Sequence, residues 1–160
     1  MTEIVIATRN PKKFRELKAL FAAAGIRWRS LASFPHVQPV PERGRTFAEN
    51  ALTKALAVAQ ATGRLALADD SGLEVGYLNG APGVRSARFA GRHGADRANN
   101  AKLLRVLRGL PSQKRRARFR CVLALARPTR VLAMTEGTLA GRIATEPRGR
   151  RGFGYDPVFV

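Results

Sequence analysis

The stretch that most constrains the fold is residues 65–75, LALADDSGLEV, which opens as an apolar run and continues into two adjacent acids. A short apolar run of this kind predicts a strand that is buried on both faces. We expect this strand to end at Asp69 and Asp70, and ligands of α/β proteins bind outside the carboxyl ends of strands. Two neighbouring carboxylates also need a cation or a proton between them. The stretch therefore predicts an α/β fold with a ligand site at the end of a buried strand.

The chain before this stretch begins with a predicted strand, a loop and a helix. Residues 3–8 (EIVIAT) predict the strand, and Asn10-Pro11 predicts a helix start with Asn10 as N-cap and Pro11 at the first helical position. Gly25 suits the C′ position at the end of this helix. The apolar residues that repeat at helical spacing are Phe14, Leu17, Leu20, Phe21 and Ala24.

Two lysines, Lys12 and Lys13, fall in the first turn of this helix, where cations oppose the helix dipole. Their position makes sense if a phosphate binds at the free backbone N–H groups of the helix start. The alternative is a plain strand-to-helix turn with solvated lysines, and this segment alone does not decide between the two. It is not a Walker loop, because the glycine spacing that ends in Gly-Lys-Ser/Thr is missing.

A second helix is predicted from Thr46, because the residues TFAE that begin there match a capping box. Gly63 is expected to end it. Glu42 stands in the loop before this helix, where a solvated acid is the plain interpretation. Glu49 is expected to be the cap partner, and Asn50 has no clear packing role.

The rest of the chain predicts one more helix and several strands. A long glycine-bearing loop spans residues 76–91, and loops of this length are often functional. Residues 128–130 predict a hairpin turn between two strands. The predicted elements are a helix over 96–107, strands over 27–31, 117–126, 131–137 and 139–145, and a strand-like run over 158–160.

The composition indicates one globular domain, since 45% of the residues are hydrophobic and 25% are charged. The net charge of +18 raises nucleic acid as a partner, but arginines outnumber lysines by roughly four to one and are spread over the whole sequence. We therefore expect non-specific charge attraction to nucleic acid rather than a dedicated binding face, and a positive field also suits a phosphate-rich small substrate. No signal peptide or membrane span is expected, and the single Cys121 agrees with a reducing cytoplasm.

Together these residues predict a metal-dependent phosphate site. Asp69, Asp70 and Glu42 can supply the hard oxygen ligands that suit Mg²⁺ held jointly with substrate phosphates. Lys12 and Lys13 can hold phosphate oxygens and neutralise leaving-group charge, and Asp70 can deprotonate an attacking water. The alternative for the two aspartates is a strand-end turn with local hydrogen bonds.

Five segments resemble, in the right order, the motifs of the inosine triphosphate pyrophosphatase family. They are residues 6–17 (IATRNPKKFREL), 46–51 (TFAENA), 68–73 (ADDSGL), 80–88 (GAPGVRSAR) and 152–157 (GFGYDP). Enzymes of this family hydrolyse ITP, dITP and XTP to the monophosphate and pyrophosphate with Mg²⁺. The resemblance implies a two-lobed α/β fold with a long mixed β-sheet flanked by helices, a cleft between the lobes, and a homodimer.

The resemblance also implies roles for individual residues. Asp70 and Glu42 match metal-binding positions, and Asp70 also matches the proposed proton acceptor. Our candidate catalytic residues are Asp70 and Lys13. An aromatic residue of the segment 152–157 can stack on the purine. The implied substrate contacts are Thr8, Arg9, Asn10, Pro11, Lys12 and Lys13 in the triphosphate loop, Ser71, and Phe153, Gly154, Tyr155 and Asp156 in the nucleoside loop.

One departure concerns the end of the sequence. Family members continue with another strand, a lysine, a Ser-His-Arg triplet and a final helix, and the sequence ends at Val160 before any of these. We expect residues 1–160 to form a single pyrophosphatase domain, C-terminally truncated relative to the family, in which the base-reading part of the site is incomplete. The alternatives are a truncated remnant that binds nucleotide with little or no activity, and a basic nucleic-acid-binding module that shares the fold.

Overall fold

We describe the protein from a computed structural model, whose described residues are 1–22 and 25–160. The five strands form one sheet in the order β2-β1-β3-β4-β5. Strand β1 pairs in parallel with both β2 and β3, and a two-residue connection joins β4 to β5, which is how antiparallel neighbours are linked. The strands are β1 (Thr2–Ile6), β2 (Ile26–Ser30), β3 (Leu65–Val75), β4 (Arg116–Arg127) and β5 (Arg130–Arg142), and the helices are α1 (Pro11–Leu20), α2 (Phe47–Thr62) and α3 (Asp96–Val106). The predicted α/β class with a mixed, helix-flanked sheet is confirmed, whereas the cleft between lobes stays a prediction.

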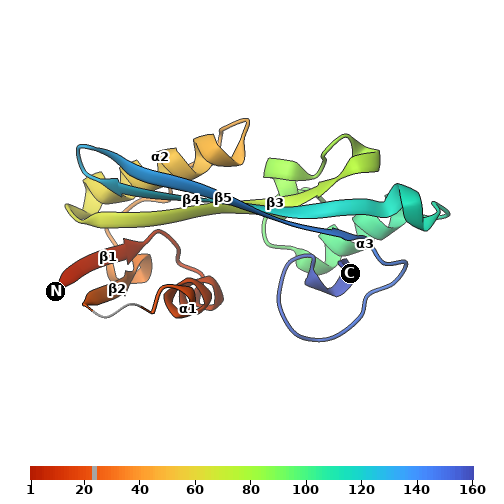
Figure 1. Cartoon of the computed structure of the whole chain (residues 1–160), viewed down its shortest axis with the longest axis horizontal. Coiled ribbons are helices and arrows are strands. Elements are labelled where there is room, and N and C mark those ends of the chain that lie inside the picture. The colour runs from red at the N-terminus through yellow and green to blue at the C-terminus, as the bar shows by residue number, and fades with distance from the viewer. Residues whose placement is uncertain (23–24) are drawn as a thin grey trace. The chain divides into compact units, whose positions relative to one another are not determined.

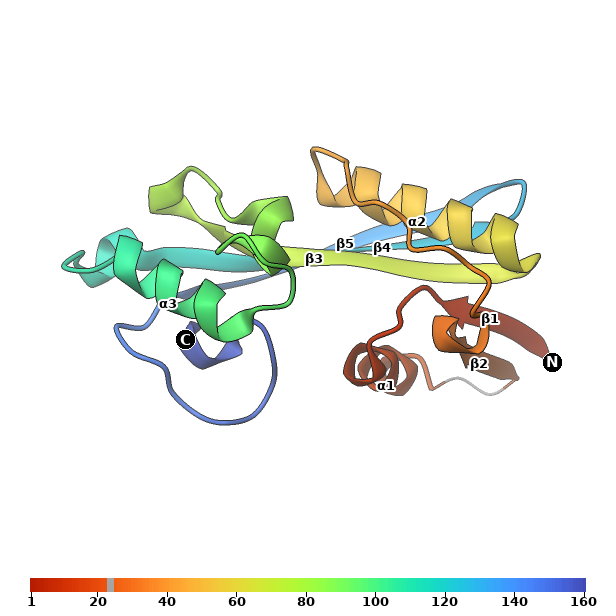
Figure 2. The same ribbon diagram turned by 180° about the vertical axis from the view of Figure 1, so that it is seen from behind.

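The chain divides into two compact units. Unit 1 contains residues 1–70 and 122–136, and unit 2 contains residues 71–121 and 137–160, so that β3, β4 and β5 each contribute to both. In unit 1, α1 and α2 lie on opposite sides of β3, as both views show (Figures 1 and 2). None of the described helices is long and apolar enough to cross a membrane.

Each unit has its own buried apolar residues. In unit 1, α2 buries the small side chains Ala51, Ala55, Val58 and Ala59 completely. This stripe follows the 3.6-residue period that was expected of an amphipathic helix. The core of unit 2 consists of Leu73, Val75, Leu103, Leu107, Ala117, Ile143, Tyr155 and Val158.

The start of α1 was predicted correctly, and its end was not. Asn10 is the N-cap, and Pro11 is the first helical residue. The helix ends at Leu20 with Phe21 as C-cap, so the prediction that Gly25 occupies the C′ position is wrong. The indole N–H of Trp28 donates to the carbonyl of Phe21 at 3.1 Å, which satisfies this group without a glycine cap. Ala24, which the predicted helical stripe included, lies outside the described residues.

The caps of α2 confirm the predicted boundaries. The Thr46 hydroxyl accepts from the Glu49 N–H at 3.1 Å, and Gly63 ends the helix with a φ of 67°, in the left-handed region that favours glycine. The carboxylate of Glu49 accepts from the Arg45 N–H at 2.6 Å rather than from the Thr46 N–H that a capping box uses. Glu49 therefore ties down the loop before the helix.

Several strand boundaries differ from the prediction. Strand β3 does not end at the two acids but continues to Val75. Strand β5 is one strand where two were expected, and residues 158–160 are not a strand. Asp156–Val158 forms a short 3₁₀ helix, and Phe159 makes only an isolated bridge to Ile143. The loop over 76–91 contains two further 3₁₀ turns, Gly76–Leu78 and Gly83–Arg88.

Candidate functional site

The two adjacent acids lie within β3 and have different partners. Successive side chains of a strand point to opposite faces of the sheet. Asp69 forms an ion pair with Lys13 of α1, and Asp70 accepts a hydrogen bond from Asn50 of α2. The expectation of a carboxylate pair at the end of a strand is therefore wrong, because the strand continues and the helices on its two sides each take one acid.

The start of α1 offers fewer donors than the sequence indicated. The Asn10 side chain accepts from the N–H groups of Lys12 and Lys13 at 2.9 and 3.4 Å, and the Phe14 N–H donates to the Asn10 carbonyl. Pro11 has no N–H group. The expected free N–H groups at this helix start are thus already used, so a phosphate there would depend on side chains.

The two remaining residues of the predicted triphosphate loop, Thr8 and Arg9, bond to backbone groups. The Thr8 hydroxyl accepts from the Asn10 N–H at 3.1 Å. The Arg9 guanidinium donates to the carbonyls of Phe34 and Val37 at 3.4 and 2.6 Å. These contacts fix the path of the chain into α1, and hence the place from which Lys12 and Lys13 project.

Helix α2 contributes two residues that the sequence analysis did not assign to the site. Lys54 forms an ion pair with Glu42 and donates to the Asp69 carbonyl at 3.0 Å. Asn50, four residues earlier on the same helical face, donates to Asp70 at 2.9 Å. The four-residue spacing of two polar side chains on an otherwise apolar face was the signal available in the sequence.

The environment of Asp70 changes its acidity. Burial raises the pKa of this carboxyl from 3.8 to about 6, and the neighbouring carboxylates Glu42 and Asp69 act in the same direction. The hydrogen bond from Asn50 and the positive charge of Lys54 oppose this rise in the pKa. A carboxyl with such a pKa exchanges its proton near neutral pH, as a general base requires.

The nucleoside segment 152–157 belongs to unit 2, where α3 holds its backbone. The Gly154 N–H donates to the Asp96 carboxylate, and the Gly154 carbonyl accepts from the Asn100 amide, both at 2.9 Å. The Asp156 carboxylate accepts from the Phe153 N–H at 3.0 Å. These bonds set the turn that carries Phe153, a residue that is 37% exposed.

Tyr155 of the same segment lies in the core of unit 2. Its hydroxyl donates to the Ser86 carbonyl at 2.7 Å, and burial raises the pKa of this phenol. Tyr155 is 5% exposed, which leaves Phe153 as the exposed aromatic residue of the segment. The stacking role that the resemblance implies therefore fits Phe153 better than Tyr155.

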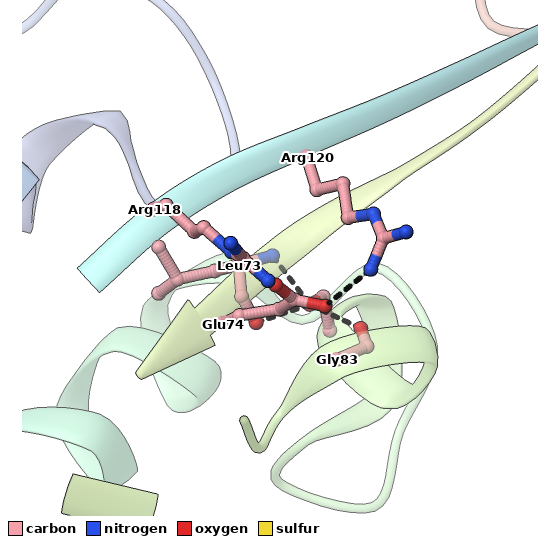
Figure 3. A network of polar contacts seen from close by, with 6 residues as sticks. Leu73, Glu74, Gly83, Arg118 and Arg120 are labelled. Atoms are coloured by element: carbon pink, nitrogen blue, oxygen red, sulfur yellow. Dashed lines mark hydrogen bonds and ion pairs between the residues drawn. The ribbon is translucent and has the colours of Figure 1, made fainter. Parts of the chain in front are cut away.

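Ser86 connects this segment to β3. Its hydroxyl accepts from the Leu73 N–H at 2.9 Å and donates to the Gly83 carbonyl at 2.6 Å. Next to Leu73, Glu74 pairs with Arg118 and Arg120 of β4 (Figure 3). The motif 80–88 thus supports unit 2, since Ser86 binds β3 with its side chain and Tyr155 with its carbonyl.

The sequence matches the Ham1 family over residues 4–160. The chain belongs to this family. That membership confirms the predicted family resemblance over nearly the whole length of the chain.

Relatives of this Ham1 chain cover it almost completely. A dITP/XTP pyrophosphatase of Desulforamulus reducens is 54% identical over 98% of this chain and 78% of its own length, and one of Bacillus subtilis is 47% identical over 100% and 81%. Among solved structures, a HAM1 protein from Coxiella burnetii is 42% identical with a TM-score of 0.89, covering 99% of this chain and 81% of its own. A nucleoside-triphosphatase / dITP/XTP pyrophosphatase from Mycobacterium abscessus is 46% identical with a TM-score of 0.85, covering 99% and 83%.

The predicted site residues of this Ham1 chain fall into two sets. In unit 1, the structure brings Lys13, Glu42 and Asp70 together with Asn50 and Lys54 around the strand β3. In unit 2, it places Ser71 on the same strand and the segment 152–157 against α3. The convergence of the two sets on one substrate stays a prediction.

Proposed function

We propose that this chain hydrolyses the non-standard purine nucleoside triphosphates ITP, dITP and XTP to the monophosphate and pyrophosphate, with Mg²⁺ as cofactor. The relatives that bear the name dITP/XTP pyrophosphatase support the reaction class and the substrates. The observation that carries the proposal is the buried carboxyl of Asp70, which is bonded to Asn50 and whose pKa is raised to about 6 by burial. Such a group suits the removal of a proton from water at neutral pH.

The acidic residues of unit 1 fit a hard divalent cation. The charge of Glu42 raises the cost of ionising Asp70, and a positive ion between the two carboxylates would offset this cost. Their oxygens are of the type that Mg²⁺ prefers, and Mg²⁺ is usually held by one or two carboxylates together with substrate phosphates. In the described residues no group of three or more histidine, cysteine, aspartate or glutamate side chains could hold a metal ion. When bound, the ion would polarise a phosphate oxygen.

The chain's own residues would perform the remaining steps. Asp70, ionised above about pH 6, would accept the proton of the attacking water. Lys12 and Lys13 would hold phosphate oxygens and stabilise the charge that develops on the leaving pyrophosphate. Phe153 would stack on the purine from unit 2. The remaining residues of the two predicted loops and of β3 would complete the substrate contacts or shape the loops that make them. They are Thr8, Arg9, Asn10, Pro11, Ser71, Gly154, Tyr155 and Asp156.

The proposal is tested by pyrophosphate release from ITP in the presence of Mg²⁺. Asp70→Asn is expected to abolish release, because an amide cannot accept the proton. Glu74→Gln is the matched control, since Glu74 is a carboxylate of the same strand that pairs with Arg118 and Arg120 outside the proposed site. Full activity of Asp70→Asn, or equal losses in both variants, would contradict the role of Asp70.

The remaining features implied by the family resemblance stay predictions. We expect a homodimer, which light scattering on the purified protein would detect. We also expect a cytoplasmic location and no dedicated nucleic-acid partner beyond charge attraction. An affinity for DNA that survives physiological salt would contradict the last expectation.

A further inference from the structure

Asn50 connects two separate segments of unit 1 through one side-chain amide. Its Nδ2 donates to Oδ2 of Asp70 at 2.9 Å, and its Oδ1 accepts from the Gly44 N–H at 2.7 Å. Because a backbone N–H can only donate, the oxygen of the amide must face Gly44, and the NH₂ group must face the carboxylate. Asn50 is 4% exposed, so both bonds are shielded from water.

Gly44 brings the loop close enough for this bond. A Cβ atom at position 44 would lie 2.5 Å from the Asn50 Oδ1 and 2.8 Å from the Glu49 Cβ, so no larger residue fits without moving the loop. The Arg45 N–H next to it donates to the Glu49 carboxylate at 2.6 Å. Two consecutive N–H groups of the loop are therefore held by two consecutive side chains of α2.

The same loop carries Glu42, two residues before Gly44. Glu42 pairs with Lys54, which lies one helical turn after Asn50. The face of α2 that bears Asn50 and Lys54 thus contacts both proposed metal-binding carboxylates. Lys54 joins Glu42 to β3 through the Asp69 carbonyl, whereas Asn50 joins the Asp70 carboxylate itself to the backbone of the Glu42 loop.

We propose that Asn50 is a positioning residue that fixes Asp70 and the Glu42 loop relative to each other, so that the two carboxylates act on one substrate. This proposal rests on the proposed function. An amide suits the position because it combines a donor for the carboxylate with an acceptor for the Gly44 N–H. An aspartate at position 50 would keep the acceptor but repel Asp70, and a leucine would leave both partners unbonded.

The test compares Asn50→Asp and Asn50→Leu with Asn99→Leu. Asn99 is a matched control because it is also buried in a helix, at 2% exposure, and its amide also bonds two partners, which are both backbone groups. Its Oδ1 accepts from the Ala90 N–H at 2.7 Å, and its Nδ2 donates to the Ala87 carbonyl at 3.2 Å. Asn99→Leu therefore has a similar structural cost without a contact to either carboxylate.

Three experiments are made on folded protein: steady-state kinetics that give kcat and KM for ITP, Mn²⁺ binding in the absence of substrate, and hydrogen exchange of the Gly44 amide. Removing a residue that orients metal-binding carboxylates lowers activity or metal affinity by roughly 10–100-fold. We expect a fall of this size in kcat and in Mn²⁺ affinity for both Asn50 variants, with a smaller change in KM. Exchange at Gly44 should accelerate in Asn50→Leu and stay slow in Asn50→Asp, which keeps the acceptor.

Unchanged kcat and Mn²⁺ affinity in Asn50→Asp would overturn the proposal, as would equal losses in Asn99→Leu. If Asn50→Leu does not fold, Asn50→Asp carries the test alone. If the wild-type chain releases no pyrophosphate from any nucleotide, the proposed function fails, but Mn²⁺ affinity still decides the positioning role. A loss confined to the Asn50 variants would then support it, and no loss would refute it.

Discussion

Replacing Asp70 with asparagine removes a carboxyl whose burial raises its pKa from 3.8 to about 6. Because the folded-state pKa is the higher one, the native protein keeps a proton that the unfolded chain releases between about pH 4 and pH 6. The stability of the native state therefore falls as the pH rises through this window. This rise in the pKa from 3.8 to about 6 corresponds to a penalty of about 3 kcal/mol that is complete above the folded-state pKa. The amide of Asp70→Asn keeps an acceptor for the Asn50 N–H without carrying charge.

Urea unfolding of the wild type and of Asp70→Asn, in EDTA, measures this penalty. At about pH 7.5 we expect the variant to be more stable by about 1.5–3 kcal/mol, with a melting temperature that is roughly 4–12 °C higher. At about pH 4 the gain should fall below about 1 kcal/mol, because the carboxyl is then largely protonated in the native state. A variant that is less stable than the wild type at neutral pH, or a gain that does not depend on pH, would refute the reasoning. Saturating Mg²⁺ should stabilise the wild type more than the variant.

Three further substitutions test individual contacts. Lys13→Gln should lower kcat/KM for ITP by roughly 10²-fold, because it removes a cation proposed to stabilise the leaving group; unchanged steady-state kinetics would contradict that role. Tyr155→Phe should lower the free energy of unfolding by about 1–2 kcal/mol, because the buried Ser86 carbonyl loses its donor; a loss within error in urea melts would show that the bond is not needed. Arg115→Met should destabilise the protein by about 3 kcal/mol or more, because the buried guanidinium donates to three backbone carbonyls, at Leu107, Ile143 and Ala144; a fall in melting temperature of less than about 2 °C would refute this.

The features that could be predicted from the sequence depend on local interactions. Asn10 and Pro11 start α1, and Thr46 and Gly63 bound α2, because each cap bonds to residues within four positions of itself. The family motifs predicted the α/β class without knowledge of which segments meet in space, and the roles that they imply for individual site residues stay predictions.

The features that could not be predicted depend on partners that are distant in the sequence. Two acids after an apolar run indicated the end of a strand, but Lys13 and Asn50, 56 and 20 residues away, satisfy Asp69 and Asp70 within β3. Asn50 had no assigned role, because its function depends on Asp70 and on the absence of a side chain at Gly44. A pattern of residue types does not show which buried polar side chains find such partners.

The most direct test of the proposed function is pyrophosphate release from ITP, XTP, ATP and GTP by the wild-type chain, with and without Mg²⁺. The proposed function predicts release from ITP and XTP that requires Mg²⁺, with far slower release from ATP and GTP. No release from any of the four nucleotides by a protein with a cooperative thermal transition would contradict it.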